Sequence, residues 1–223
     1  MSGLEPFTAM DAFKGIHCYY KTAMNKFAKL LILGAVLLAI FALGHGFYYS
    51  PNGDSGLSLA STSQGATAIS IDAGKYPSRL LIPELSIDVN VQHVGVTKNG
   101  NMAAPSNFID VSWYKFGTVP GYRGSAVMAG HQDNAMGLDG VFKHLEDLEL
   151  GDDVYVIGQD GKRLHFKVID KQIYDYNDPS PLKRIFNADD GVYLNLITCA
   201  GKWLQVVKTN DQRLVVYTEL VKD

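Results

Sequence analysis

From Tyr76 onward, short apolar runs alternate with turn signals along the chain. Val, Ile, Leu and Tyr dominate these runs, and pairs of Gly with Asp or Asn bound several of them. Runs of this length and composition predict β-strands. We expect strands over Arg79–Ile82, Val89–Val96, Ser125–Ala129, Asp153–Ile157, Leu164–Tyr174, Val192–Thr198 and Leu214–Leu220. Many short strands with few helices indicate a mainly β fold, either an antiparallel sandwich or a barrel.

Two short helices interrupt this series of strands. The first is expected over 141–148, where Val141, Leu145 and Leu148 recur at helical spacing, and the second is PLKRIF at 181–186. Residues 77–223 are numerous enough to bury a single core.

The longest apolar run lies much earlier, from Leu30 to Tyr49, and contains no Asp, Glu, Lys or Arg. Twenty helical residues rise about 30 Å, which matches the hydrocarbon core of a bilayer. A cleaved signal peptide is an alternative, since Ala39–Gly46 offers a loose cleavage site, but its core would be shorter. A buried globular helix would show a polar face, and none is present. We therefore expect an uncleaved transmembrane anchor at 30–49.

Charge flanking this run predicts its orientation. Four lysines precede the run and the next basic residue is Lys75, so the positive-inside rule places residues 1–29 in the cytoplasm. Residues 50–76 are rich in Gly, Ser, Ala and Thr, which is typical of a flexible linker. Residues 77–223 would then form an exported domain on the outer face of the cell membrane. Residues 50–223 carry 16 basic and 21 acidic side chains without a basic cluster, which disfavours nucleic-acid binding.

The chain has two cysteines, Cys18 and Cys199. With the expected topology they lie on opposite sides of the membrane and cannot pair. An unpaired cysteine in an exported domain indicates a reactive thiol or an intermolecular disulfide.

Three residues beside short β-type runs form a candidate catalytic set: Cys199, His131 and Arg213. A thiol is mostly protonated at neutral pH, so a neighbour must take its proton, and histidine titrates in the right range. Arginine cannot act as a base, but it can hold a developing oxyanion. Together the three roles indicate acyl transfer through a thioester.

Strand alternation places these side chains. In the run ending at Cys199, residues 193, 195, 197 and 199 share one face, and residues 213, 215 and 217 share a face in the last strand. We expect Cys199 and Arg213 at strand ends, on a rim open to solvent.

Each of these residues also has an ordinary interpretation. Cys199 could be an inert buried thiol and Arg213 a surface arginine. His131 could be a surface loop residue or could join Asp133 and His144 at a metal, although the spacing fits no zinc pattern. We expect neither a metal nor a cofactor.

The sequence around the three residues resembles the sortase family. LITC followed by Ala200-Gly201 is similar to the TLxTC signature, with Leu196 in place of the first Thr. AGHQDN is similar to the family's histidine segment, and Arg213 matches its third catalytic position. The likeness spans residues 77–220 and is nearest to classes D, E and F, with class F preferred.

This resemblance implies an eight-stranded sortase β-barrel and a cysteine transpeptidase with Cys199, His131 and Arg213 as catalytic residues. It further implies that Thr198 and Ala200 border the substrate. The expected partners are secreted proteins with a C-terminal LPxTG-like sorting signal, cleaved between Thr and Gly, and a cell-envelope amine or water as acceptor. Two alternatives stay open: a sortase-like surface scaffold without catalysis, and another exported cysteine peptidase acting on wall peptides.

Overall fold

The computed structural model describes residues 76–98, 100–133 and 137–222 of the 223-residue chain. The expected tail at 1–29, anchor at 30–49 and nearly all of the expected linker at 50–76 lie outside these residues. Within the described ranges, no helix has the length and hydropathy needed to cross a membrane.

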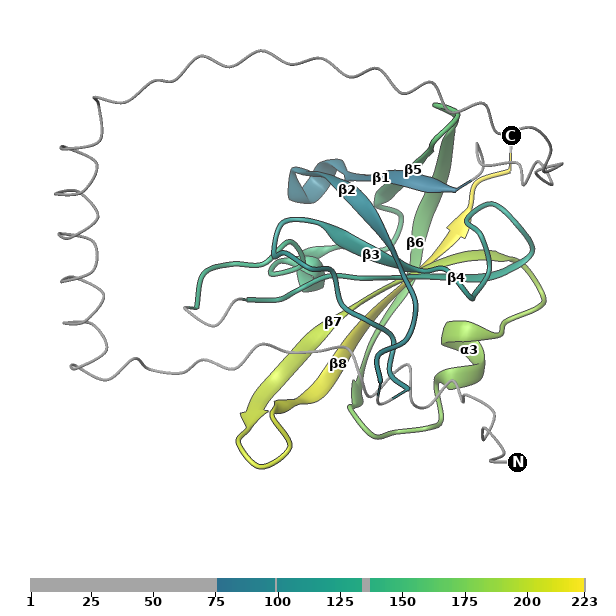
Figure 1. Cartoon of the computed structure of the whole chain (residues 1–223). Coiled ribbons are helices and arrows are strands. Elements are labelled where there is room, and N and C mark those ends of the chain that lie inside the picture. Colours follow the sequence, from purple (N-terminus) through teal and green to yellow (C-terminus); the bar gives the residue numbers. More distant parts are fainter. Residues whose placement is uncertain (1–75, 99, 134–136, 223) are drawn as a thin grey trace, which may run out of the picture. The chain divides into compact units, whose positions relative to one another are not determined.

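Eight strands close into a barrel in the order β1-β2-β3-β4-β7-β8-β6-β5, which confirms the mainly β expectation. The strands are β1 (Pro77–Ile82), β2 (Ile87–Val94), β3 (Val111–Tyr114), β4 (Gly124–Ala129), β5 (Asp153–Gly158), β6 (Arg163–Asp175), β7 (Val192–Leu204) and β8 (Thr209–Leu220). The helical segments are η2 (Pro83–Leu85), η3 (Leu145–Asp147) and α3 (Leu182–Phe186). The pairs β2–β3 and β4–β7 are parallel and the others are antiparallel. Figure 1 shows α3 beside β4 and the β7–β8 hairpin projecting beyond the other strands.

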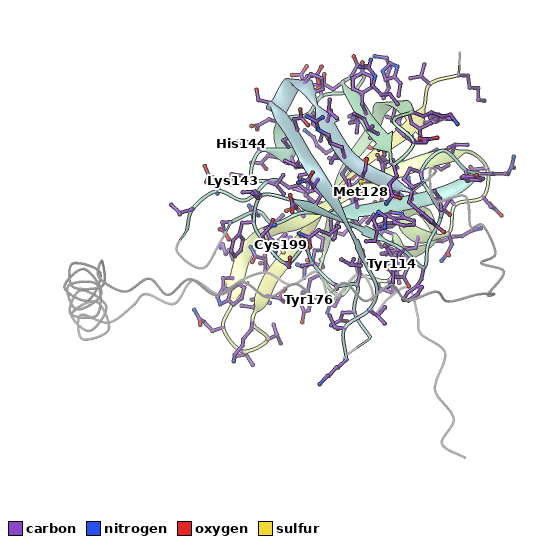
Figure 2. The ribbon with its side chains drawn as sticks, turned by 45° about the horizontal axis from the view of Figure 1, so that its top comes forward. Tyr114, Met128, Lys143, His144, Tyr176 and Cys199 are labelled. Carbon is purple, nitrogen blue, oxygen red and sulfur yellow. The ribbon has the colours of Figure 1, made fainter. Side chains whose placement is uncertain are left out.

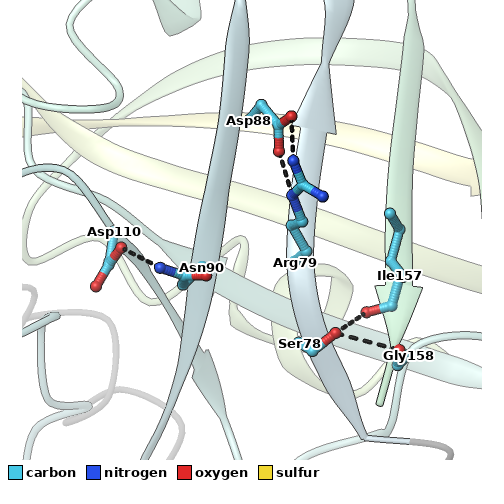
Figure 3. Close-up of polar contacts among 7 residues, drawn as sticks. All are labelled: Ser78, Arg79, Asp88, Asn90, Asp110, Ile157 and Gly158. Carbon is cyan, nitrogen blue, oxygen red and sulfur yellow. Dashed lines mark hydrogen bonds and ion pairs between the residues drawn. The ribbon is translucent and has the colours of Figure 1, made fainter. Parts of the chain in front are cut away.

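The barrel closes where β1 meets β5, across an irregularity between Pro77 and Arg79. Ser78, the residue at this bulge, donates its hydroxyl toward the carbonyls of Ile157 (3.0 Å) and Gly158 (3.1 Å). On the other side of β1, the Arg79 guanidinium pairs with Asp88 on β2 (Figure 3). These contacts join β1 to both of its neighbouring strands, β5 and β2.

Alternation along β7 and β8 separates two apolar clusters. Leu194, Leu196, Leu214 and Val216 belong to the larger buried cluster that unites all eight strands. Cys199 and its face-mates on β7 and β8 belong to a second cluster with Ile185 and Phe186 of α3. Because α3 packs on this second face, the cysteine lies on the helix-covered side of the sheet.

Three expected elements differ from the structure. The helix expected over 141–148 consists of turns followed by η3 (Figure 2, Lys143 and His144). The N–H groups of Lys143, Leu145 and Asp147 donate to carbonyls only three residues back, which gives turns and a 3-10 segment in place of an α-helix. β7 continues to Leu204 and β8 begins at Thr209, because Gly201 (φ 75°) permits a bulge where the strand was expected to end. The strand β3 was not expected at all.

An acid-dependent contribution to stability is expected on the β5–β6 pair. Asp153 Oδ1 accepts from Lys167 Nζ (2.7 Å) and lies 2.7 Å from His165 Nε2. The Lys167 ammonium and then the His165 ring lower the pKa of Asp153 to about 2. A lowered folded-state pKa contributes stability above the ordinary value near 3.8, and this contribution is lost as pH falls through about 2.

We expect Asp153→Asn to lower the urea midpoint slightly at pH 6, with the gap from the unmodified chain shrinking between pH 4 and pH 2. Urea titrations at several pH values measure this gap. Glu149→Gln, at an exposed position before β5, is a control for generic loss of an acidic side chain. A gap that stays constant down to pH 2 contradicts the assignment.

Candidate active site

The strand order brings the three candidate catalytic residues together, because β4, β7 and β8 are consecutive in the barrel. Cys199 on β7 is the direct cross-strand partner of Arg213 on β8. On the other side of β7, the β4 ladder extends to Gly130, whose N–H donates to Ile197 O (3.2 Å). His131 is the next residue, so the continued register of β4 with β7 places its backbone across from Cys199. With neighbouring strands about 4.8 Å apart, cysteine stands between histidine and arginine.

Cys199 is 4% exposed and packs in the second apolar cluster (Figure 2). It is disulfide-bonded in this structure. This differs from the unpaired thiol expected from the sequence. That expectation relied on a membrane between Cys18 and Cys199, and residues 1–75 lie outside the described part. A disulfide sulfur must be reduced before it can act as a nucleophile, so the catalytic chemistry belongs to the reduced chain.

Arg213 is fully buried, unlike the exposed side chain that is usual for arginine. Its guanidinium donates to Thr209 Oγ1 (2.7 Å) and to the carbonyls of Gln212 (2.8 Å) and Asn210 (3.1 Å). Burial lowers the pKa of Arg213 to about 10, so the group stays cationic at neutral pH. The turn of the β7–β8 hairpin thus holds a buried positive charge opposite the cysteine.

His131 is 3% exposed and contacts two residues of the loop before β3. Its ring lies 4.9 Å from the ring of Phe108, and Nε2 lies 3.1 Å from Pro105 O. A carbonyl can only accept a hydrogen bond, so Nε2 carries the proton in this contact. In neutral His131 the acceptor nitrogen is therefore Nδ1.

Cys199 and Arg213 lie within the β7–β8 hairpin, not at strand ends as expected, since both strands continue past them. The hairpin beyond them ends in an exposed turn with Val206 and Val207. The extended β7–β8 hairpin therefore borders the site beyond Cys199 and Arg213, whereas the sequence suggested an open barrel rim.

The two residues expected to border the substrate have different surroundings. Thr198 is buried, and its hydroxyl donates to Gly130 O (2.9 Å), the residue before His131. Ala200 is half-buried and packs against the barrel cluster. Thr198 thus connects the cysteine strand to the histidine segment, and its contact with substrate stays a prediction, as does that of Ala200.

No group of three or more His, Cys, Asp and Glu side chains that could hold a metal occurs in the part of the chain that the structure describes. His144 pairs with Asp147 through Nδ1 (3.1 Å), and Asp133 pairs with Asp139 in an isolated bridge.

Gly140 is a residue near the site that the sequence analysis missed. Its N–H donates to Gln132 O (2.9 Å), and a Cβ at this position would overlap the carbonyl of His131. In the sequence, Asp139-Gly140 only signals a turn. The crowding arises from the fold, where this turn packs directly on the histidine segment.

We expect Gly140→Ala to move the His131 backbone and to lower kcat/KM by up to about 10²-fold. The measurement is steady-state kinetics on a sorting-signal peptide, with circular dichroism to show that the barrel persists. Gly161→Asn, in a turn where a Cβ meets nothing within 4 Å, is the control and should keep its activity. Equal kinetics for Gly140→Ala and the unmodified chain would show that His131 is insensitive to this contact.

In this closed barrel, Cys199 and Arg213 lie on the neighbouring strands β7 and β8, and His131 follows β4 on the other side of β7. The molecule therefore has the elements of a thiol acyl-transfer enzyme. A Sortase domain model matches residues 80–221, and the chain belongs to the sortase family. It is therefore an enzyme of the cysteine transpeptidase type.

Solved structures support the fold. Sortase A from Corynebacterium diphtheriae (lid mutant) is 20% identical, with a TM-score of 0.51 over 66% of this chain and 70% of that one. Sortase E1 from Streptomyces coelicolor, solved with a tripeptide in its active site, is 21% identical, with a TM-score of 0.50 over 67% and 90%. Sortase C of Streptococcus pneumoniae is 17% identical, with a TM-score of 0.50 over 67% and 70%. Comparison with curated protein sequences gives no match. The preference for class F is not confirmed by these similarities.

Proposed function

We propose that this sortase is anchored in the cell membrane by residues 30–49 and cleaves an LPxTG-like sorting signal between Thr and Gly. The proposal rests mainly on the cross-strand pairing of Cys199 with Arg213. The end of β4 brings His131 to the other side of the cysteine. This order supplies a nucleophile between a proton carrier and a cation.

In the first step, the reduced Cys199 gives its thiol proton to His131, and the thiolate sulfur forms a bond with the threonine carbonyl carbon. Arg213, with a backbone N–H near Ala200, stabilises the oxyanion. The Thr–Gly C–N bond then breaks, and His131 donates a proton to the departing glycine amine. This step leaves a thioester on Cys199.

In the second step, a cell-envelope amine or water attacks the thioester. The acceptor loses a proton to His131, and the cysteine leaves as a thiolate. The products are a secreted protein joined to the envelope through a new amide, or a free acid when water attacks. The protein needs no cofactor in this scheme.

The direct test is mass spectrometry of the reduced full-length chain after incubation with an LPxTG peptide. We expect a mass increase equal to the acyl fragment ending at Thr, located on Cys199. Cleavage of the peptide between Thr and Gly without any acyl adduct on Cys199, even in samples quenched early in the reaction, would contradict the thioester mechanism.

The sequence also left a non-catalytic scaffold open, and the reactivity of Cys199 tests this alternative directly. The two functions separate after reduction. A catalytic thiol reacts with iodoacetamide at a rate that falls when His131 is replaced by alanine, whereas a structural cysteine reacts slowly in both chains.

The anchor is tested separately. Cell fractionation of the full chain and of a variant lacking residues 30–49 should place the first in the membrane fraction and the second elsewhere. Protease added outside intact cells should reach residues 77–223. If both chains fractionate alike, the anchoring role of 30–49 is wrong.

A further inference from the structure

A cavity of about 500 Å³ lies on the outer face of β7 and β8, away from the catalytic set. Asn195 on β7 and Tyr217 on β8 are cross-strand partners and line it together. Asn195 precedes Cys199 by four residues, which corresponds to roughly 13 Å along a strand. The cavity shares no residue with Cys199, His131, Arg213, Thr198 or Ala200. Its full lining is Ile169, Ser180, Lys183, Arg184, Ala188, Asp189, Asp190, Tyr193, Asn195 and Tyr217.

Asn195 contributes a buried acceptor to this cavity. The residue is 0% exposed, and its Nδ2 donates to the carbonyls of Ile185 (2.7 Å) and Arg184 (3.3 Å). Both bonds use the amide nitrogen, so the orientation of the amide is determined by its contacts. Its Oδ1 is among the buried side-chain atoms of the described residues that have no hydrogen-bond partner. A buried carbonyl oxygen without a donor is unfavourable, so a ligand N–H would be stabilised there.

Charges of both signs surround this acceptor. Lys183 comes from α3, whereas Asp189 and Asp190 come from the loop that follows. None of the three forms an ion pair with another residue in the described ranges. Lys183 therefore makes no direct ion pair with either carboxylate, although all three residues line the same cavity.

The cavity walls are held in place by other contacts. Arg123 Nε donates to Asp189 O (2.8 Å), and Gly124 N–H donates to Gly191 O (2.9 Å), so the loop is tied to the start of β4. Arg184 is engaged by Asp170 on β6 (2.6 Å) and lies 3.7 Å above the Tyr217 ring. Burial, and then the neighbouring Asp190 carboxylate, raise the pKa of Tyr193, so its phenol keeps a proton to donate to Asp190. Lys183 is therefore the cation that remains available to a ligand.

We propose that this cavity is a second binding site, which takes a small zwitterion with an N–H donor, of which a free dipeptide is the simplest form. The ligand's carboxylate pairs with Lys183, its ammonium faces Asp189 and Asp190, and an N–H donates to Asn195 Oδ1. A purely anionic ligand would leave the Asp189 and Asp190 carboxylates facing a like charge, and a purely apolar ligand would leave all three charges without a partner. Both are therefore disfavoured.

The site also has a structural link to the catalytic cluster. Lys183 and Arg184 of α3 line the cavity, while Ile185 and Phe186 of the same helix pack with Cys199 in the second apolar cluster. A ligand in the cavity therefore contacts an element that also covers the catalytic face.

The test is isothermal titration calorimetry of the full-length chain in detergent, with glycylglycine as the probe. N-acetylglycylglycine lacks the ammonium and glycylglycinamide lacks the carboxylate. We expect glycylglycine to bind with a Kd on the order of 1 mM, and each analogue to bind at least about fivefold more weakly. Lys183→Ala should weaken glycylglycine to a similar extent, whereas Lys98→Ala, an exposed lysine elsewhere, should leave it unchanged.

The proposal is overturned if glycylglycine gives no binding heat at 20 mM, if the analogues bind equally well, or if Lys183→Ala and Lys98→Ala behave alike. The titration does not depend on acyl transfer. A failure here leaves the role of Cys199 standing, and a failure to form the Cys199 adduct leaves this site standing.

Discussion

Cys199→Ala is expected to abolish the acyl adduct and to reduce kcat on a sorting-signal peptide on the order of 10⁴-fold or more. The alanine leaves the cross-strand partner Arg213 and the neighbouring β4 ladder in place, so peptide binding through the rest of the site can persist. What disappears is the only atom of the set that can form a thioester. The measurement is single-turnover kinetics in reducing buffer, with intact-mass detection of the adduct.

The matched control is Cys18→Ala, which leaves Cys199 as the only thiol of the chain. This variant should keep its activity in reducing buffer. Full turnover by Cys199→Ala would end the thioester mechanism.

The stability of a Cys199→Ala chain is not expected to limit this experiment. The side chain is small, so the cavity that its truncation creates in the second apolar cluster is small. A thermal-unfolding midpoint close to that of the unmodified chain would show that lost activity reflects lost chemistry.

Much of the barrel was predictable because its strands follow simple patterns. β7 and β8 alternate between the two apolar clusters, and this alternation correctly grouped Ile197 with Cys199 on β7 and Val215 with Tyr217 on β8. β3 was missed for the opposite reason. All four of its residues, Val111–Tyr114, are buried, so the strand shows no alternation between buried and exposed positions.

Other features depend on contacts between distant segments. The segment 141–148 was expected to be helical from its apolar spacing. Its later N–H groups donate only three residues back, while those of Val141 and Phe142 bond to Phe108 and His131. Spacing describes which side chains are buried and does not reveal where the backbone donors go. The importance of Gly140 has the same origin, since only the folded turn brings it against His131.

The candidate catalytic set was found from residue types and from family resemblance, whereas the environment of Arg213 was not. An arginine in a strand is usually exposed, and no local pattern signals that the hairpin turn will enclose this guanidinium. The enclosing contacts come from Thr209 and the carbonyls of Asn210 and Gln212, within four residues of Arg213. They exist because β8 begins at Thr209, five residues earlier than expected.

Arg213→Lys is expected to lower kcat/KM by about 10²–10³-fold, as loss of an oxyanion donor does in other acyl-transfer enzymes. Lysine keeps a positive charge but replaces a planar set of donors with a single ammonium, so it cannot hold Thr209 and the hairpin carbonyls while also facing the substrate. Arg79→Lys, at the exposed ion pair on β1, is the matched control and should leave kcat/KM unchanged.

The pH profile distinguishes this role from a purely structural one. Burial lowers the pKa of Arg213 to about 10, so the active cationic form persists below that pH and is lost as pH rises through it. An ordinary lysine has a pKa near 10.4, and the same burial would lower it further. A thiol and an imidazole ordinarily titrate with pKa values of about 8.5 and about 6.5, so loss of the Arg213 charge forms a further alkaline limb of kcat/KM above theirs. This further limb should move to lower pH in Arg213→Lys and stay in place in Arg79→Lys. If the limb does not move while activity falls, Arg213 supports the hairpin and does not contribute its charge to the reaction.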